Sequence, residues 1–181
     1  MLTENEVLAS VAPICSAISQ NLRDGLLNGN LDMVFLSGAI IESNVRNVDY
    51  VCYPMAWVAS PELPLAAEAV SLAEIAQFPI LTYSRRTRPN LDIRDKFVRA
   101  SIANYKIYGN TSLSAVVKLC VDAVGVAVIP PAVIRHELDS KKLRLVDVSG
   151  GALTDLHFTI SYMLTADAHL LEAVAALALQ S

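Results

Sequence analysis

Apolar residues between positions 113 and 124 recur at spacings of three and four, which places them in one stripe along an α-helix. Thr111 or Ser112 stands immediately before this stripe, where a hydroxyl group can accept a hydrogen bond from an N–H of the first turn. We expect Gly125 to end the helix, because a residue with positive φ commonly follows a helix and glycine adopts that conformation without steric cost.

The four residues 126–129 are all apolar, which is typical of a strand buried on both faces of a parallel sheet. Pro130 and Pro131 end this strand, and a second helix is expected to begin there because proline suits the first helical turn. The succession of capped helix, glycine, buried strand and helix favours a doubly wound α/β sheet.

An earlier segment repeats this pattern. Ser19 is predicted to cap a helix that ends at Gly29, the strand 31–36 follows, and Ser37 and Gly38 form the loop beyond its carboxyl end. In open α/β sheets, ligands bind outside the carboxyl ends of strands and near the N-termini of helices. Two such segments facing each other would form a cleft with one wall from each lobe.

Strands and helices alternate through the rest of the chain. The other predicted strands are 11–18, 50–59, 80–83, 105–108, 143–148 and 156–164. The other predicted helices begin with a capping box at Ser71 and Glu74, with a cap at Asn90 or Asp92, and near Asp167.

The long strands 50–59 and 156–164 bracket the middle of the chain. If they run side by side, residues 1–59 and 156–181 form a first lobe, and residues 60–155 form a second lobe inserted into it. Paired crossover strands would then act as a hinge of the kind that lets two domains close on a ligand.

Composition narrows the class of protein. The 181 residues suffice for one domain or two small lobes. Mean hydropathy is high at +0.43, but no stretch reaches the ~18 consecutive apolar residues that a membrane-spanning helix needs. No signal peptide is expected, and three cysteines without paired spacing favour reduced thiols and a cytoplasmic location. A net charge of −4 argues against nucleic-acid binding by this chain.

Segments of the chain, in this order, resemble the effector-binding domain of LysR-type transcriptional regulators. They are SQNLRDGLLNGNLDMVFLSG, VASPELPLA, SLAEIAQFPILTY and TSLSAVVKLCVDAVGVAVIPPAVI. The resemblance implies a type II periplasmic-binding-protein fold: two Rossmann-like lobes, two crossover strands and a small effector in the cleft between the lobes. It also implies a homodimer or tetramer. The family's N-terminal helix-turn-helix is not found here, so DNA would be contacted only through a domain that this chain lacks.

Polar residues at predicted strand ends are the candidate effector ligands. The hydroxyl and N–H groups of Asn110, Thr111 and Ser112 could hold a carboxylate with help from the helix dipole, or they could simply cap the helix. Ser84 and Arg85 follow the strand PILTY, where an arginine can pair with an anion through two hydrogen bonds, or lie in a solvated loop. The remaining predicted lining residues, for which a tight turn or core packing is the alternative, are Ser37, Gly38, Ile129 and Pro130.

No catalytic motif is visible. The sequence has no G-x-S-x-G elbow, P-loop or G-x-G-x-x-G, and His136, His157 and His169 are scattered without metal-ligand spacing. We therefore predict an effector-sensing regulatory domain that binds a small, anionic metabolite, with no catalytic residue, metal or cofactor. The alternatives are an α/β enzyme that acts on a small acid and a solute-binding protein of a transporter.

Overall fold

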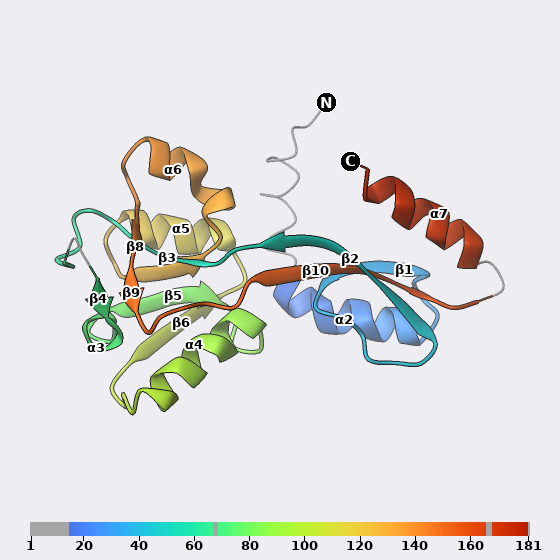
Figure 1. The fold of residues 1–181 in the computed structure, drawn as a ribbon, viewed down its shortest axis with the longest axis horizontal. Helices are drawn as coiled ribbons and strands as arrows, with labels where there is room; N and C mark the ends of the chain where they lie inside the picture. Colours follow the sequence, from blue (N-terminus) through green and yellow to red (C-terminus); the bar gives the residue numbers. More distant parts are fainter. Residues whose placement is uncertain (1–14, 67–68, 166–167, 181) are drawn as a thin grey trace. The chain divides into compact units, whose positions relative to one another are not determined.

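The computed structural model describes residues 15–66, 69–165 and 168–180 of the chain (Figure 1). The chain divides into two compact units, one built on residues 54–155 and the other on residues 17–53 and 156–180. Within the described residues, every helix is too short or too polar to cross a membrane.

The unit of residues 54–155 contains a five-stranded mixed sheet in the order β6-β5-β7-β3-β8. β5 runs parallel to β6 and β7, whereas β3 is antiparallel to β7 and β8. A separate parallel pair joins β4 and β9. The elements are β3 (Ala56–Ala59), β4 (Val70–Ser71), α3 (Leu72–Ile75), β5 (Pro79–Tyr83), α4 (Arg88–Arg99), β6 (Lys106–Asn110), α5 (Leu113–Val121), β7 (Val126–Ile129), η2 (Pro131–Ile134), α6 (Arg135–Asp139), β8 (Arg144–Val146) and β9 (Val148–Ser149).

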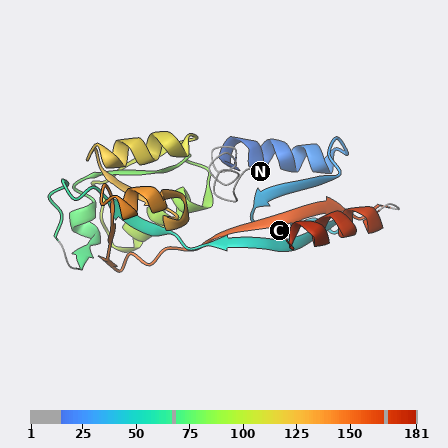
Figure 2. The same ribbon diagram turned by 90° about the horizontal axis from the view of Figure 1, so that it is seen from above.

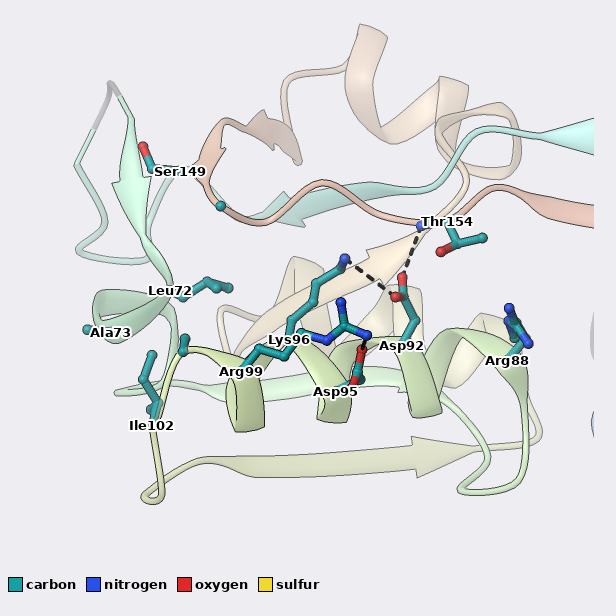
Figure 3. A pocket seen from close by; sticks show the side chains of 12 residues that line it. Leu72, Ala73, Arg88, Asp92, Asp95, Lys96, Arg99, Ile102, Ser149 and Thr154 are labelled. Carbon is teal, nitrogen blue, oxygen red and sulfur yellow. Dashed lines mark hydrogen bonds and ion pairs between the residues drawn. The ribbon is translucent and has the colours of Figure 1, made fainter.

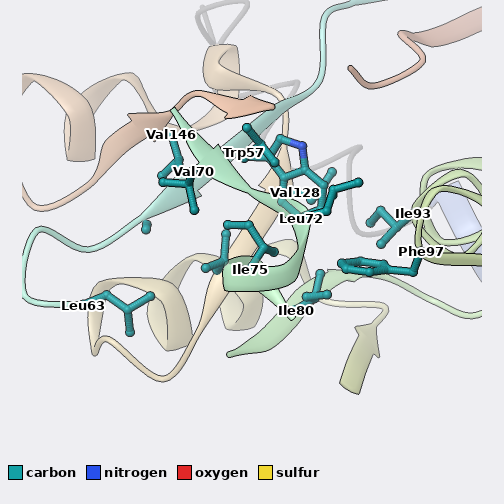
Figure 4. Close-up of a cluster of buried hydrophobic side chains, with 13 residues drawn as sticks. Trp57, Leu63, Val70, Leu72, Ile75, Ile80, Ile93, Phe97, Val128 and Val146 are labelled. Carbon is teal, nitrogen blue, oxygen red and sulfur yellow. The ribbon is translucent and has the colours of Figure 1, made fainter. Parts of the chain in front are cut away.

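Helices cover both faces of this sheet. Ile93 and Phe97 of α4 pack into one cluster with Val126 and Val128 of β7 (Figure 4). Because side chains alternate along a strand, Ala127 and Ile129 face the other side. There α5 contacts β3, β5 and β7, and the Cys120 thiol donates to a backbone carbonyl of β3. The doubly wound arrangement expected from the apolar pattern is confirmed for this unit.

Several local predictions hold in this unit. All of 126–129 is buried, as the apolar run predicted. Ser71 and Glu74 form the predicted capping box at the start of α3. The Ser112 hydroxyl caps α5 by accepting from the N–H of Ala115. The structure at these positions therefore follows the local pattern of the sequence.

Two predictions about helix ends are wrong. α4 begins at Arg88 after Thr87, so Asn90 and Asp92 lie inside the helix and do not cap it. The residue with positive φ after α5 is Ala123, at 55°, and not Gly125. A Cβ atom at Gly125 would lie 2.1 Å from the carbonyl oxygen of Pro79, so glycine is required there for close backbone approach.

The second unit contains a three-stranded antiparallel sheet in the order β1-β10-β2. α2 packs on one face through Leu26, against Val34 and Leu36 of β1. α7 packs through Ala175 against Ile160 and Tyr162 of β10, which the alternation places on the opposite face. The elements are α2 (Cys15–Leu27), β1 (Met33–Ser37), β2 (Val45–Tyr53), β10 (Leu156–Met163) and α7 (Ala168–Ala178).

The predicted strand 31–36 corresponds to β1, and Gly29 follows α2 with a φ of 71°. β1 is antiparallel to β10, however, so this segment does not build a parallel sheet like its later counterpart. The strand predicted over 11–18 is wrong for residues 15–18, which open α2. Residues 1–14 lie outside the described part of the chain.

The two long predicted strands run side by side only in part. β2 begins at Val45, before the predicted start at residue 50, and pairs with β10 from Tyr53 opposite Leu156 to Val45 opposite Met163 (Figure 2). The strand predicted over 50–59 is interrupted at Pro54, which has no N–H for a ladder hydrogen bond. Residues 56–59, which the sequence analysis placed in the first lobe, form β3 in the sheet of residues 54–155. Closure of two lobes on a ligand stays a prediction.

Candidate functional site

The parallel strands of residues 54–155 bring most of the predicted site residues to one edge of the sheet. Tyr83, the last residue of β5, pairs with Asn110, the last residue of β6. β7 runs parallel to β5 on its other side and ends at Ile129. The carboxyl ends of three adjacent strands therefore lie at this edge. The predicted site residues at these ends, or directly beyond them, are Ser84, residues 110–112 and residues 129–130. This edge is the candidate effector site.

Asn110 and Ser112 organise the start of α5. The Asn110 Oδ1 atom accepts from the Ser112 N–H at 2.9 Å, and the Ser112 hydroxyl accepts from the Ala115 N–H at 3.3 Å. The N–H groups of Leu113 and Ser114 have no acceptor within the helix, as at any helix N-terminus. The arrangement is a complete cap that still presents backbone donors at the sheet edge.

Thr111 lies between these two capping residues and is exposed. Its hydroxyl group is accordingly accessible beside the backbone donors that begin α5. Within the described residues, no hydrogen bond engages that hydroxyl group. Thr111 is thus the member of the 110–112 triplet whose polar atom is not used by the local fold.

Asn90, which the sequence analysis assigned to a helix cap, instead fixes the β5–β6 edge. Its fully buried amide donates to the Tyr83 carbonyl at 2.9 Å and accepts from Arg94 Nε at 2.9 Å. A Cβ atom at Gly109 would lie 2.8 Å from the same carbonyl oxygen and 3.2 Å from the Asn90 amide nitrogen. A signal for Asn90 was present in the sequence, because it is a polar residue one turn before the apolar stripe of α4.

The loop after β5 is a tight turn. The N–H and hydroxyl groups of Thr87 both donate to the Ser84 carbonyl, at 3.0 and 2.7 Å. Ser84 is half-buried, whereas Arg85 and Arg86 are exposed. No ion pair within the described residues involves Arg85. The fold thus holds the backbone of this loop and leaves the Arg85 guanidinium unengaged by a carboxylate.

Ile129 and Pro130 are buried, and Ile129 pairs with Ala56 of β3. Burial in the core is therefore a sufficient reason for apolar residues at these two positions. A contribution to the floor of a ligand site stays a prediction.

Ser37 and Gly38 belong to the other unit. Gly38 has a φ of 82°, its N–H donates to the His157 carbonyl at 3.0 Å, and its own carbonyl accepts from the Thr159 hydroxyl at 2.8 Å. Thr159 continues into a buried polar chain through Ser161 to Asn47. No local sequence pattern indicates this chain of hydrogen bonds, which anchors the loop after β1. A place for Ser37 and Gly38 beside the other site residues stays a prediction.

A groove of about 830 Å³ lies along α4 and the segment 149–154 (Figure 3). Two of its three cations are paired with carboxylates, Lys96 with Asp92 at 3.4 Å and Arg99 with Asp95 at 2.8 Å, whereas the third, Arg88, has no ion pair within the described residues. Asp92 also accepts from the Thr154 N–H at 2.9 Å. The groove contains none of the predicted site residues, and two of its three lining cations are already paired with carboxylates, so it is a weaker candidate for an anionic ligand.

Comparison with known proteins identifies the family. Residues 14–180 match the family described as LysR substrate binding domain. No curated protein sequence matches the chain.

Solved structures agree with this assignment. A double cysteine-to-serine mutant of the regulatory domain of MetR, a LysR family regulator from N. meningitidis, is 19% identical, with a TM-score of 0.68 over 87% of this chain and 76% of that chain. The apo regulatory domain of HypT from Salmonella typhimurium is 16% identical, with a TM-score of 0.69 over 90% and 79%. The CcmR regulatory domain from Synechocystis PCC6803 in complex with 2-PG is 14% identical, with a TM-score of 0.67 over 87% and 78%.

The mixed α/β units of this chain therefore have the type II periplasmic-binding-protein-like fold. The chain belongs to the LysR substrate-binding domain family, the regulatory effector-binding domains of transcription regulators.

Proposed function

We propose that this chain binds a small anionic metabolite at the carboxyl edge of β5, β6 and β7, and that binding closes two lobes of a LysR-type regulator. The observation that carries the proposal is the capped N-terminus of α5, which offers backbone donors and the unused Thr111 hydroxyl at that edge. The positive end of the helix dipole favours a negatively charged group there.

Arg85 supplies the positive charge in this proposal. Its guanidinium can form two parallel hydrogen bonds with a carboxylate or phosphate. It is exposed and follows the strand adjacent to Asn110, so a ligand of a few carbon atoms at the start of α5 would be within its reach. The ligand of CcmR, 2-PG, supports a small molecule as effector for this chain too.

Ser37 and Gly38 would supply the opposite wall of the ligand site, and Ile129 and Pro130 its floor. The ligand would bias the open and closed states only by the difference between its affinities for them. The regulator would act in the cytoplasm as a homodimer or tetramer, and its contact with DNA would come from a helix-turn-helix domain outside this chain.

Thermal unfolding against a panel of small carboxylates, phosphorylated acids and aromatic acids tests the proposal. A ligand at 100 times its Kd stabilises the folded state by ~2.7 kcal/mol. For a chain of this length, the expected rise in Tm is roughly 5–11 °C. A shift without consumption of the ligand supports a sensor.

Consumption of the stabilising compound would instead favour an α/β enzyme that acts on a small acid. The variant pair Arg85→Ala and Arg86→Ala locates the site, because both arginines are exposed and only Arg85 is assigned to the ligand. If a compound raises Tm equally in both variants, the assignment of Arg85 is wrong.

A further inference from the structure

Strand register brings a thiol and an imidazole together on the surface of the β2–β10 ladder. Cys52 of β2 lies directly opposite His157 of β10, and both side chains are exposed. The Cys52 Sγ atom is 3.6 Å from the His157 Nε2 atom. Side chains directly opposite each other in an antiparallel pair are held with their Cβ atoms ~4.5–5.5 Å apart, so the backbone itself maintains this proximity.

A carboxylate completes the group. Asp155 precedes His157 by two residues, and residues two apart on an extended chain project to the same side. One ligand atom from each of Cys52, Asp155 and His157 lies within 4.8 Å of the other two. Sulfur, nitrogen and oxygen donors therefore converge at one exposed point.

The distances fit a zinc ion. Zinc binds cysteine sulfur at about 2.3 Å and histidine nitrogen at about 2.0–2.1 Å, usually with tetrahedral geometry. Two such ligands at the tetrahedral angle are about 3.6 Å apart, and the Cys52 Sγ and His157 Nε2 atoms are separated by 3.6 Å. The Asp155 carboxylate lies within 4.8 Å of both other donor atoms and its side chain is exposed, so a change of its side-chain rotamer would bring an oxygen toward the same centre.

We propose that Cys52, Asp155 and His157 bind a Zn²⁺ ion, with water in the fourth coordination position. A thiolate with an imidazole selects zinc over magnesium or calcium, which prefer oxygen ligands alone. The thiol loses its proton when the metal binds, so affinity rises with pH until the thiolate forms fully. None of the three ligands is a residue assigned to the effector, and the Gly38 N–H contacts His157 only through its backbone carbonyl, so the proposal does not depend on the proposed function.

No metal site is predicted from the sequence, because these ligands do not have the short spacing of a metal-binding motif. Cys52 and His157 are separated by 105 residues, and the pairing of β2 with β10 supplies the proximity that sequence spacing lacks.

The test is a zinc titration of the full chain, purified reduced and metal-free, against a chromophoric chelator. The expected result is one equivalent of zinc bound by the unaltered chain, and at least a tenfold weaker affinity in Cys52→Ser and His157→Gln. Asp155→Asn should weaken binding as well. His169→Gln is the matched control, since it removes an exposed histidine from the same unit. Tm without metal, measured for each variant, checks that the fold is intact.

Cobalt provides an independent readout. Co²⁺ bound by the unaltered chain should show a thiolate-to-cobalt charge-transfer band, and Cys52→Ser should abolish it while His169→Gln retains it. Zinc affinity that is the same in Cys52→Ser, His157→Gln and the control would overturn the proposal. A cobalt spectrum without the thiolate band would overturn it too.

Discussion

A Cβ atom at Gly125 would lie 2.1 Å from the Pro79 carbonyl oxygen, so the backbone between α5 and β7 passes against the start of β5. This contact positions the two parallel strands whose carboxyl ends carry Ser84 and Ile129. Backbone atoms cannot give way as a flexible side chain can.

Gly125→Ala should therefore destabilise the chain by at least about 2 kcal/mol through overpacking. Gly25→Ala is the matched control: the new Cβ meets only the side chain of Leu31, and Gly25 lies within α2. Alanine in a helix is favoured over glycine by up to ~1 kcal/mol, so this control should be neutral or stabilising. Urea denaturation of both variants measures the difference. Equal stability of the two would contradict the close approach at Gly125.

Substitutions at Thr111 and Ser112 should distinguish helix capping from ligand binding. Ser112→Ala removes the acceptor for the Ala115 N–H and should reduce the free energy of unfolding by about 1 kcal/mol. Thr111→Val removes a hydroxyl that caps nothing, so stability should be unchanged while affinity for the effector falls at least tenfold, the loss of about one hydrogen bond to a charged group. Denaturation and ligand titration of both variants provide the measurements. An unchanged effector affinity in Thr111→Val would remove Thr111 from the site.

The buried amide of Asn90 should be required for stability. Asn90→Ala deletes its hydrogen bonds to the Tyr83 carbonyl and to Arg94 within a closely packed region. We expect a loss of about 2–4 kcal/mol, combining lost hydrogen bonds with a small cavity. Asn104→Ala, at an exposed asparagine, serves as the control and should lie within ~0.5 kcal/mol of the unaltered chain. A small effect at Asn90 would mean that the β5–β6 edge is held by other contacts.

The stability that the capping box of α3 contributes should depend on pH, because Glu74 is one of its hydrogen-bonding partners. Hydrogen bonds from the Ser71 hydroxyl, and then from the Ser71 backbone N–H, lower the pKa of Glu74 below its ordinary value of 4.5. Since the folded pKa is lower than the unfolded one, this stabilisation is present above the unfolded pKa and is lost as pH falls through the folded pKa.

Glu74→Gln should therefore lower stability at neutral pH, and its difference from the unaltered chain should shrink as the solution is acidified below 4.5. Denaturation midpoints at several pH values measure this. A difference that is constant with pH would show that the Glu74 charge contributes nothing.

The thiols should differ in reactivity. Burial raises the pKa of Cys120 to about 11, so at pH 8 its thiol is protonated as well as inaccessible. Cys52 is exposed. A thiol reagent at pH 8 should modify Cys52 in the native chain and reach Cys120 only in denaturant, as peptide mass mapping would reveal. Rapid native labelling of Cys120 would indicate that α5 separates readily from β3.

Local patterns predicted most of the fold. The apolar stripe of α5, the Ser112 cap and the apolar run of β7 each depend on residues close together in the sequence, and all three were predicted correctly. Positions whose role depends on residues far away in the sequence were predicted wrongly. Gly125 was assigned to a helix end, whereas the backbone of Pro79 determines it. Asn90 was read as a cap because a polar side chain at that spacing has no other local explanation.

The candidate site was predictable in part for the same reason. Parallel pairing brings Ser84 and Asn110 to one edge, and that pairing follows from the order of strands and helices. The proximity of Cys52 and His157 follows only from the register of two strands that are far apart in the sequence.

The order of strands in the second unit also affects biosynthesis. β1 and β2 do not pair with each other; each hydrogen-bonds to β10, which lies between them. On the ribosome both strands emerge more than a hundred residues before β10, with unpaired edges that can associate with other chains. The strands of the five-stranded sheet all lie between residues 56 and 146, so that sheet can be completed first. The nascent chain therefore carries two strands without their pairing partner through most of its synthesis. Chaperone binding at residues 33–53 would protect these strands from association with other chains during that interval.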